Sequence, residues 1–386
     1  MVDFNFEDSC YGCGACANVC PVDAIAMKSD ERGFLIPEIS KDRCVSCGQC
    51  DKVCISSVHT AQAKNVDDKK AFLYVHPNAD ILERSASGGG FSVLAEKILA
   101  CGGYVCGCVF DSDMKAVHIV SNTKSDISRM HGSKYVQSDI TGCFNKIRDL
   151  LKKKTLVLFC GTPCQCAAIQ SVFKGKGNEF LYTVAIICHG VPSPKVWRKW
   201  KEHLEKKMKS PMCYANHRAK GKNYNTPESI YTFENGNNLR QATYLEDLYC
   251  YAFSTDVFLR NTCYRCKYKE NNITADVIIG DYFDFRENSV YTKGVSSVVI
   301  NTEKGKKLFG RTAENAREIK ISEVVEKNKA LVKPVQKNQN RDRFFDDMEK
   351  WGIQKAIKRN IPYTRFLIKK CLYKARLFEQ LRKVKR

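Results

Sequence analysis

The sequence predicts an α+β protein in two parts, a small cysteine-rich domain followed by a larger mixed α/β domain. Eight of the 21 cysteines lie before residue 57, whereas residues 71–345 alternate short apolar runs with amphipathic segments. Apolar and charged contents of 44% and 27% are typical of folded soluble proteins, which argues against disorder. We expect a first domain over residues 1–60, a polar linker over Ser57–Lys70, an α/β domain over residues 71–345 and a basic tail over residues 351–386.

The first domain contains a repeated cysteine motif. The spacing CxxCxxCxxxC occurs twice, offset by 34 residues, and it is the spacing of a bacterial-ferredoxin domain with two 4Fe-4S clusters. In such domains three cysteines of one run and the fourth of the other bind each cluster. The predicted ligands are Cys10, Cys13, Cys16 and Cys54 for one cluster, and Cys44, Cys47, Cys50 and Cys20 for the other. Zinc and disulfides are the alternatives, although zinc sites favour paired CxxC motifs.

The second domain is predicted to contain buried strands and at least one amphipathic helix. Apolar runs rich in β-branched residues occur at 155–159, 181–187, 275–279 and 295–300. Between residues 91 and 99 apolar side chains recur at i, i+3, i+4, i+7 and i+8, which predicts a helix that Gly102 and Gly103 terminate.

Four cysteines of this domain lie at strand ends or in loops. Cys164 follows the 155–159 strand, where Pro163 marks a helix start, and Cys188 follows the next strand. Cys263 and Cys266 form a CxxC motif. We expect these four to form a third tetrathiolate site, with Cys160 or Cys166 as alternatives to Cys164. The other cysteines are predicted to be mostly buried small apolar residues: Cys101, Cys106, Cys108, Cys143, Cys160, Cys166, Cys213, Cys250 and Cys371.

A series of short motifs in this domain resembles a known family. The motifs are Arg84–Ser92, Gly132–Gln137, Gly161–Gln165, Cys188–Pro194, Cys263–Cys266, Ile279–Asp281 and Gly294–Thr302. Their order is similar to that of the coenzyme F420 hydrogenase/dehydrogenase beta-subunit family, here with a fused ferredoxin domain, over about residues 1–310. The resemblance implies an α/β flavin-binding domain with FAD, and a cluster beside the flavin on the positions of Cys164, Cys188, Cys263 and Cys266. It leaves the substrate open, since relatives use a deazaflavin, reduce a chlorophyll precursor or lie among cell-surface polysaccharide genes.

Several residues are candidates for the flavin site. A glycine-rich turn leads into the predicted helix, where free amides can bind a phosphate, although a plain loop is the alternative. The turn residues are Ser85, Ser87, Gly88, Gly89 and Gly90. Lys134, next to Tyr135, is a candidate cation beside the flavin ring, and the alternative is that Lys134 is an exposed surface lysine. His189 is a candidate proton donor or neighbour of the cluster, and Asp281 is a candidate for orienting flavin or substrate; a structural role is the alternative for both.

The predicted function is that of a flavin-dependent oxidoreductase. FAD would exchange a hydride with an organic partner, such as reduced coenzyme F420, and single electrons would pass through three 4Fe-4S clusters to a redox partner protein or ferredoxin. The rival is an electron-transfer subunit without its own substrate that serves a partner enzyme, for example in cell-surface polysaccharide biosynthesis. The net charge of +21 alone suggests nucleic-acid binding, but no nucleic-acid-binding motif accompanies it, so we expect none.

The two ends of the chain bear on location. The first residues carry acids where a signal peptide carries lysine, and no apolar run approaches the roughly 18–20 residues of a membrane helix, which predicts a cytoplasmic protein. The tail, residues 351–386, holds twelve Lys or Arg against one acid, Glu379. It predicts a basic amphipathic helix after Pro362 that contacts an anionic membrane or an acidic partner, or else packs on the body.

Overall fold

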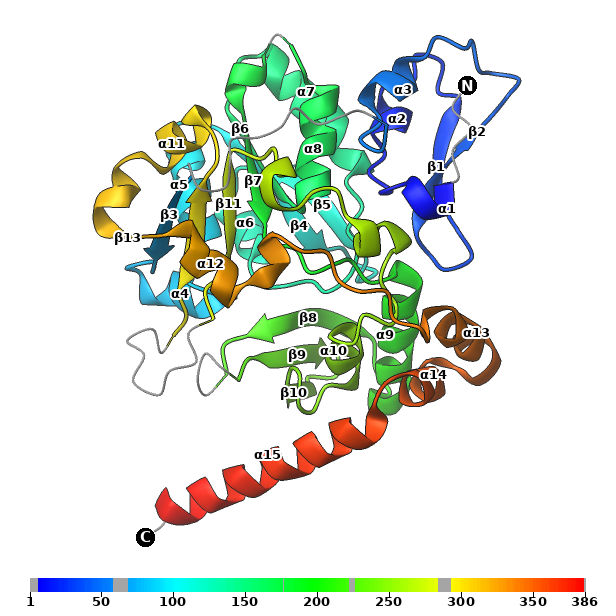
Figure 1. Ribbon diagram of the computed structural model, residues 1–386, viewed down its shortest axis with the longest axis vertical. Helices are drawn as coiled ribbons and strands as arrows, with labels where there is room; N and C mark the ends of the chain where they lie inside the picture. Colours follow the sequence, from blue (N-terminus) through cyan, green and yellow to red (C-terminus); the bar gives the residue numbers. More distant parts are fainter. Residues whose placement is uncertain (1–5, 58–68, 176, 222–225, 284–292, 385–386) are drawn as a thin grey trace.

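A computed structural model describes residues 6–57, 69–175, 177–221, 226–283 and 293–384. It confirms the mixed α/β class. A large twisted sheet forms the body, a small cysteine-rich domain packs against the body beside helices α7 and α8, and a long helix follows at the C-terminus (Figure 1). The predicted linker lies mostly outside the described residues.

The main sheet has eight strands. Its order is β13 (Arg317–Ile319), β3 (Lys70–Tyr74), β12 (Ser296–Ile300), β11 (Val277–Asp281), β7 (Leu181–Ile186), β6 (Val157–Gly161), β4 (Tyr104–Phe110) and β5 (Ala116–Ser121). The neighbours β11, β7, β6 and β4 are parallel, and the remaining pairs are antiparallel. The four strands expected from the sequence therefore all form, within two residues of their expected bounds. The carboxyl ends of the parallel strands share one edge, where open α/β sheets bind ligands.

Helices cover both faces of this sheet. Successive residues of β6 alternate between two hydrophobic cores: Val157 and Phe159 join the core under α7 (Phe144–Lys152) and α8 (Pro163–Val172), while Leu158 joins the core under α5 (Gly90–Ala100). A strand buried on both faces is the reason that its sequence is a continuous apolar run. The predicted helix is α5, and it ends as expected, since Gly102 adopts a φ of 72° just beyond it.

Shorter helices connect the strands. They are α4 (Ala79–Arg84), α6 (Lys124–Met130), α10 (Leu248–Phe253), α11 (Glu303–Phe309) and α12 (Ile321–Lys327). A separate antiparallel sheet consists of β8 (Met212–Ala219), β9 (Glu228–Phe233) and β10 (Asn238–Ala242), and α9 (Pro194–Met208) packs on it. This second sheet has an aromatic core that includes Trp197, Tyr231 and Tyr249.

The cysteine-rich domain shares a core with the body. It contains α1 (Phe6–Ser9), α2 (Ala15–Asn18), β1 (Ile25–Ser29), β2 (Leu35–Ile39) and α3 (Gln49–Val53). Ala15, Val53 and Ile55 pack in the same hydrophobic cluster as residues of α7 and α8. Ser171 Oγ of α8 donates to the Val53 carbonyl over 3.1 Å. The domain is thus held in a fixed position on the body (Figure 1).

The C-terminal residues form α13 (Arg341–Trp351), α14 (Ile353–Asn360) and α15 (Tyr363–Val384). The helix predicted after Pro362 is α15. Among the described helices, none is both long enough and apolar enough to cross a membrane.

The prediction for the nine remaining cysteines is only partly correct. Cys106, Cys143, Cys166 and Cys250 are buried, and Cys108 and Cys160 are partly buried. Contrary to the expectation, three are exposed: Cys101, Cys213 and Cys371. Cys101 follows the end of α5, Cys213 occupies an outward position of β8, and Cys371 lies on the outer side of α15.

Candidate redox centre

Three of the sequence-selected residues lie at the carboxyl edge of the main sheet. Cys164 is in the first turn of α8, directly after β6, and Cys188 comes two residues after β7. Asp281 is the last residue of β11. A short 3-10 helix, η4 (Asn261–Arg265), carries Cys263, and Cys266 follows it. The parallel arrangement of β6, β7 and β11 is what places these loops side by side.

The four cysteines of the predicted third site influence one another electrostatically. Burial first, and then the neighbouring Cys266 and Cys188, raises the pKa of the Cys164 thiol to about 12. Burial, together with Cys188, Cys164 and Cys266, likewise raises the pKa of Cys263. The effect of burial on the pKa of Cys164 thus outweighs that of the α8 N-terminus, whose free amides favour a thiolate. A buried group of thiolates needs compensating positive charge, which bound iron supplies.

Backbone amides point at several of these sulfurs. The Val191 amide donates to Cys263 Sγ over 3.4 Å. Burial raises the pKa of Cys188 and of Cys266, and amide hydrogen bonds, from Gly190 to Cys188 and from Tyr268 to Cys266, partly offset that increase. Hydrogen bonds to ligand sulfurs are typical of iron-sulfur sites. In the described part of the chain, no three His, Cys, Asp or Glu side chains converge tightly enough to hold a single metal ion.

The first N-terminal set is assembled across the domain. After burial, the neighbouring Cys10, Cys54 and Cys50 raise the pKa of Cys16 to about 12. This places Cys54 of the second run beside the first run, as the ferredoxin pattern predicts. Gly12 adopts a φ of 65°, which lets its amide donate to Cys10 Sγ over 3.2 Å.

The second N-terminal set surrounds a small surface cavity. Its volume is about 40 Å³, and its lining includes all four predicted ligands, Cys20, Cys44, Cys47 and Cys50. The Ala24 amide donates to Cys20 Sγ over 3.2 Å. Cys47 is exposed, and the neighbouring Val45 is 61% exposed, so this set lies at the protein surface.

Two tyrosines lie between the first N-terminal set and the body set. The rings of Tyr11 and Tyr268 meet edge to face, with centroids 5.3 Å apart. Burial is the main reason that the pKa of Tyr268 is raised, and Tyr11, Cys164 and Cys13 raise it further. Cys164 also raises the pKa of Cys13. The two cysteine sets are therefore close neighbours, although they belong to different domains.

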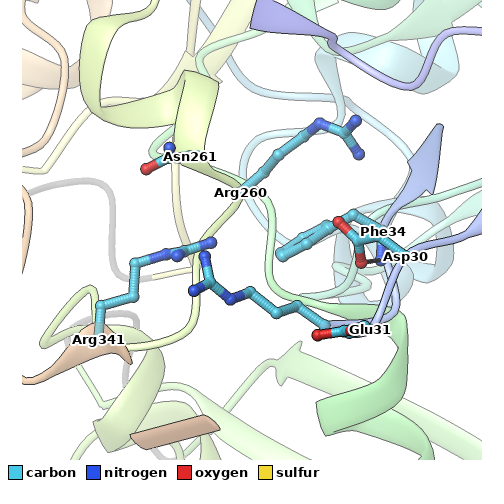
Figure 2. Close-up of a pocket in the computed structure, with 7 residues that line it drawn as sticks. Asp30, Glu31, Phe34, Arg260, Asn261 and Arg341 are labelled. Carbon is cyan, nitrogen blue, oxygen red and sulfur yellow. Dashed lines mark hydrogen bonds between the residues drawn. The ribbon is translucent and has the colours of Figure 1, made fainter. Parts of the chain in front are cut away.

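Arg260 joins the two domains at this point. Its guanidinium donates to the carbonyl oxygens of Cys10 and Leu35, each over 2.8 Å, and to Gln137 Oε1 over 3.0 Å. It lies on a cavity of about 60 Å³ between the cysteine-rich domain, η4 and α13 (Figure 2). The cavity is lined by Asp30, Glu31, Arg32, Phe34, Arg260, Asn261 and Arg341.

The glycine-rich turn lies at the same sheet edge. Gly88 and Gly90 amides donate to Ser296 Oγ over 3.0 and 3.2 Å, and Ser87 Oγ donates to the Val295 carbonyl over 2.7 Å. A Cβ on Gly88 would lie 2.2 Å from the Tyr74 carbonyl oxygen, so only glycine lets the turn approach β3 and β12 this closely. Ser85 Oγ donates instead to the Ile81 carbonyl of α4.

Two cations lie near this turn, Arg218 in β8 and Lys220 just after it. Lys220 Nζ donates to the Ser87 carbonyl over 2.7 Å, and burial lowers its pKa to about 8. Arg218, 4% exposed, pairs with Asp281 over 3.3 Å. Asp281 and Arg218 both influence Tyr135 electrostatically. The turn, Asp281 and Tyr135 thus belong to one region. The Gly88 and Gly90 amides, which were expected to be free for a phosphate, donate to Ser296, so the groups here that suit an anionic cofactor are the cations Arg218 and Lys220.

Lys134 and Tyr135 have different surroundings. Lys134 Nζ donates to the carbonyls of Arg129, Met130 and His131, so it caps α6, and burial lowers its pKa to about 8. The Tyr135 hydroxyl lies 2.7 Å from the Tyr244 hydroxyl. The alternative of an exposed lysine is therefore wrong, but the ammonium is aimed at α6.

His189 forms a pair with an acid. Its Nε2 lies 2.6 Å from Asp256 Oδ1, and its ring meets Phe253 edge to face. Phe253 in turn contacts Tyr135, with ring centroids 4.6 Å apart. A continuous aromatic contact therefore links the residue after Cys188 to the Tyr135 region.

Comparison with known proteins agrees with this arrangement. Residues 154–327 match the family model for the C-terminal part of the coenzyme F420 hydrogenase/dehydrogenase beta subunit, and residues 9–58 match the 4Fe-4S dicluster domain. Residues 154–327 therefore contain the C-terminal domain of the coenzyme F420 hydrogenase/dehydrogenase beta-subunit family. The chain is an iron-sulfur electron-transfer protein with a domain of this oxidoreductase family.

The family match spans the strands and loops that carry Cys164, Cys188, Cys263 and Cys266. A chain of the F420-reducing [NiFe] hydrogenase complex from Methanosarcina barkeri is also similar, with 18% identity and a TM-score of 0.45 over 78% of this chain and 90% of that one. None of the curated proteins matches.

Sequence reasoning missed several residues of this site. Arg218 and Lys220 lie at the end of β8, in a segment for which no strand was specified. Arg260, Tyr11 and Tyr268 act through contacts between distant parts of the chain. The HRAKGK sequence at 217–222 was the one available signal, since it concentrates cations after an apolar strand.

Proposed function

We propose that this chain is an iron-sulfur flavoprotein that exchanges a hydride between FAD and an organic partner and passes single electrons to a redox protein. The observation that carries the proposal is the convergence of Cys164, Cys188, Cys263 and Cys266 at the carboxyl edge of the sheet. Four partly buried thiols that lie close together, with amides aimed at the sulfurs of Cys188, Cys263 and Cys266, form a donor set that fits a 4Fe-4S cluster.

Three cysteine sets support three clusters. Bound clusters would supply one-electron transfer in the order of the sets: body, first N-terminal, second N-terminal. The electrostatic effect of Cys164 on the pKa of Cys13 supports the first step of this order, and that of Cys50 on the pKa of Cys16 supports the second. The chain's own contribution is to hold the sets together through the shared core, Arg260 and Tyr268. The exposed edge at Cys47 suits a redox partner protein or ferredoxin.

The flavin would lie at the Ser85–Gly90 turn. Bound FAD would supply the change from two-electron hydride chemistry to single electrons. Lys220 and Arg218 provide positive charge beside the turn, and Asp281 holds Arg218 in place. Gly88 and Gly89 keep Cβ atoms out of the turn. Tyr135 and His189 lie along the contact from this region to Cys188, which supports placing flavin and cluster next to each other.

A second candidate function is electron transfer without an organic substrate. It is favoured by the exposure of the second N-terminal set, where Val45 and Cys47 offer a docking edge for a protein. In this case the chain would transfer electrons between two proteins.

One assay separates the two functions. The anaerobically purified chain is mixed with reduced deazaflavin coenzyme F420, or with NAD(P)H, and a one-electron dye. Continuous consumption of the hydride donor supports the oxidoreductase. Exchange of electrons only with reduced ferredoxin supports the second candidate. Cys188→Ala is the matched variant, because it should retain the turn and remove the body cluster.

A further inference from the structure

Over its described side chains, residues 363–375, helix α15 packs on the body mainly along one stripe. Tyr363, Phe366, Lys370 and Tyr373 are the buried or partly buried residues of its described side chains, at spacings of three, four and three. Phe366 is 3% exposed and packs on Tyr251, with ring centroids 4.9 Å apart. Residues at this spacing lie on one face of a helix, so the opposite face points away from the protein. Figure 1 shows the helix extending beyond the body toward the C-terminus.

The outer face of α15 is apolar. Leu367, Ile368 and Leu372 are 41%, 55% and 58% exposed, and Cys371 is exposed among them. At about 100° per residue these positions fall within one half of the helix circumference, opposite the Phe366 stripe. Three large apolar side chains gathered on one outward face form a patch, unlike scattered surface residues.

Basic residues border this patch on both sides. Arg365, Lys369 and Lys374 are exposed and occupy the two margins of the apolar face. The tail as a whole carries twelve Lys or Arg against one acid. A second copy of the chain would bring two basic helices together, which like-charge repulsion opposes. An anionic bilayer offers both an apolar layer for the leucines and negative headgroups for the lysines.

We propose that the outer face of α15 binds an anionic membrane surface. Leu367, Ile368 and Leu372 enter the boundary between headgroups and acyl chains, and the lysines and arginine beside them extend to the phosphates. The helix lies along the surface, because charged residues recur in every turn. This binding is independent of flavin, substrate and clusters.

Vesicle sedimentation of the full-length holoprotein tests the proposal. The vesicles contain phosphatidylcholine with phosphatidylglycerol, or phosphatidylcholine alone, and the salt concentration is varied. Two α15 variants are compared. The triple glutamine variant combines Leu367→Gln, Ile368→Gln and Leu372→Gln, and the charge variant combines Lys369→Glu and Lys374→Glu. The matched charge control is Lys152→Glu with Lys153→Glu, two exposed lysines at the end of α7. Cluster absorbance and circular dichroism verify that each variant is folded.

The expected result is sedimentation with the anionic vesicles only, weakened by salt and by at least about tenfold in both α15 variants. The α7 control should bind like wild type. Equal binding of the triple glutamine variant, or equal binding to neutral vesicles, would overturn the proposal. Binding to polyglutamate that depends on α15, without binding to vesicles, would also overturn it, because it would indicate an acidic protein as the partner. A dimer of the wild type that is lost in the triple glutamine variant would overturn it as well.

Discussion

The Nε atom of Arg260 donates a hydrogen bond to the carbonyl oxygen of Cys10 over 2.8 Å, although 250 residues separate them in the sequence. Arg260 is 4% exposed, and its charge opposes the effect of burial on the pKa of both Cys10 and Cys164. One buried cation therefore acts on the ligand sets of two domains. It both holds the cysteine-rich domain in place and offsets the negative charge of thiolates.

We expect Arg260→Gln to lower the reduction potential of the first N-terminal cluster by tens of millivolts. A buried positive charge favours the more negative, reduced state of a cluster, so its loss makes reduction harder. The measurement is a redox titration of the full chain followed by electron paramagnetic resonance.

Arg265→Gln is the matched control, because Arg265 lies on the same segment and is 66% exposed at its pair with Asp8. An equal shift in both variants would show that the effect is not specific to Arg260. Arg260→Lys should restore part of the potential, since the charge remains but the planar group that bonds Cys10, Leu35 and Gln137 is lost.

We expect Cys188→Ala to reduce bound iron from about twelve to about eight atoms per chain, because one of three four-iron clusters is lost. Cys143→Ala should keep the full iron content. Cys143 is buried, its Sγ donates to the Ile140 carbonyl, and its cysteine neighbour is Cys106, which is not a predicted ligand. Iron analysis after anaerobic reconstitution measures both. A full iron content in Cys188→Ala would remove Cys188 from the ligand set.

These cysteine sets show what the sequence can predict. The spacing of cysteines within a run is visible in the sequence itself, so the two N-terminal runs and the strands before Cys164 and Cys188 could be predicted from the pattern alone. The fourth ligand of a cluster could be predicted where a known rule links the two runs, as for Cys54. The small sheet β8–β10 was not specified, because its residues alternate without a long apolar run.

Contacts between distant segments were not accessible from the sequence. Nothing near Arg260 distinguishes it from the other 62 basic residues. Its role depends on the docking of the cysteine-rich domain, which in turn depends on a shared core of Ala15, Val53 and α7. For the same reason the surroundings of Lys134 were not predicted: its ammonium donates to carbonyls at the end of α6, four residues away.

Gly89→Val should yield protein with iron but without flavin absorbance. Gly89 adopts a φ of 84°, and a Cβ there would lie 2.7 Å from His76 Cβ, so the turn must move. Gly102→Val is the matched control, because Gly102 has a similar φ of 72° but no atom within 4 Å of an added Cβ. Both variants have comparable backbone strain. Flavin retained in Gly89→Val at wild-type occupancy would exclude the turn from the site.

Acid should destabilise the fold through three histidines, of which His118 and His217 are buried and His131 is partly buried. Burial lowers the pKa of His118 and His131 to about 4 and that of His217 to about 3. In the unfolded chain a histidine binds a proton below about pH 6.5, whereas these three stay neutral when folded, so stability is present above pH 6.5 and is lost as the pH falls toward 4. At pH 5.5 each histidine should lower the unfolding free energy by roughly 1.4 kcal/mol, or about 4 kcal/mol in total.

The thermal midpoint at pH 7.5 and pH 5.5 measures this effect, and His217→Phe identifies its source. His217 is fully buried, and its ring stacks on Tyr135 at an interplanar angle of 6°, so phenylalanine can occupy the same space. The variant also loses the hydrogen bond from the Tyr135 amide to His217 Nδ1, so its midpoint at pH 7.5 should be lower than that of wild type. Its further decrease on acidification should nevertheless be smaller by about one third, because one of three titrating groups is gone. An unchanged acid decrease would mean that protonation of other groups, the cluster thiolates included, governs acid stability.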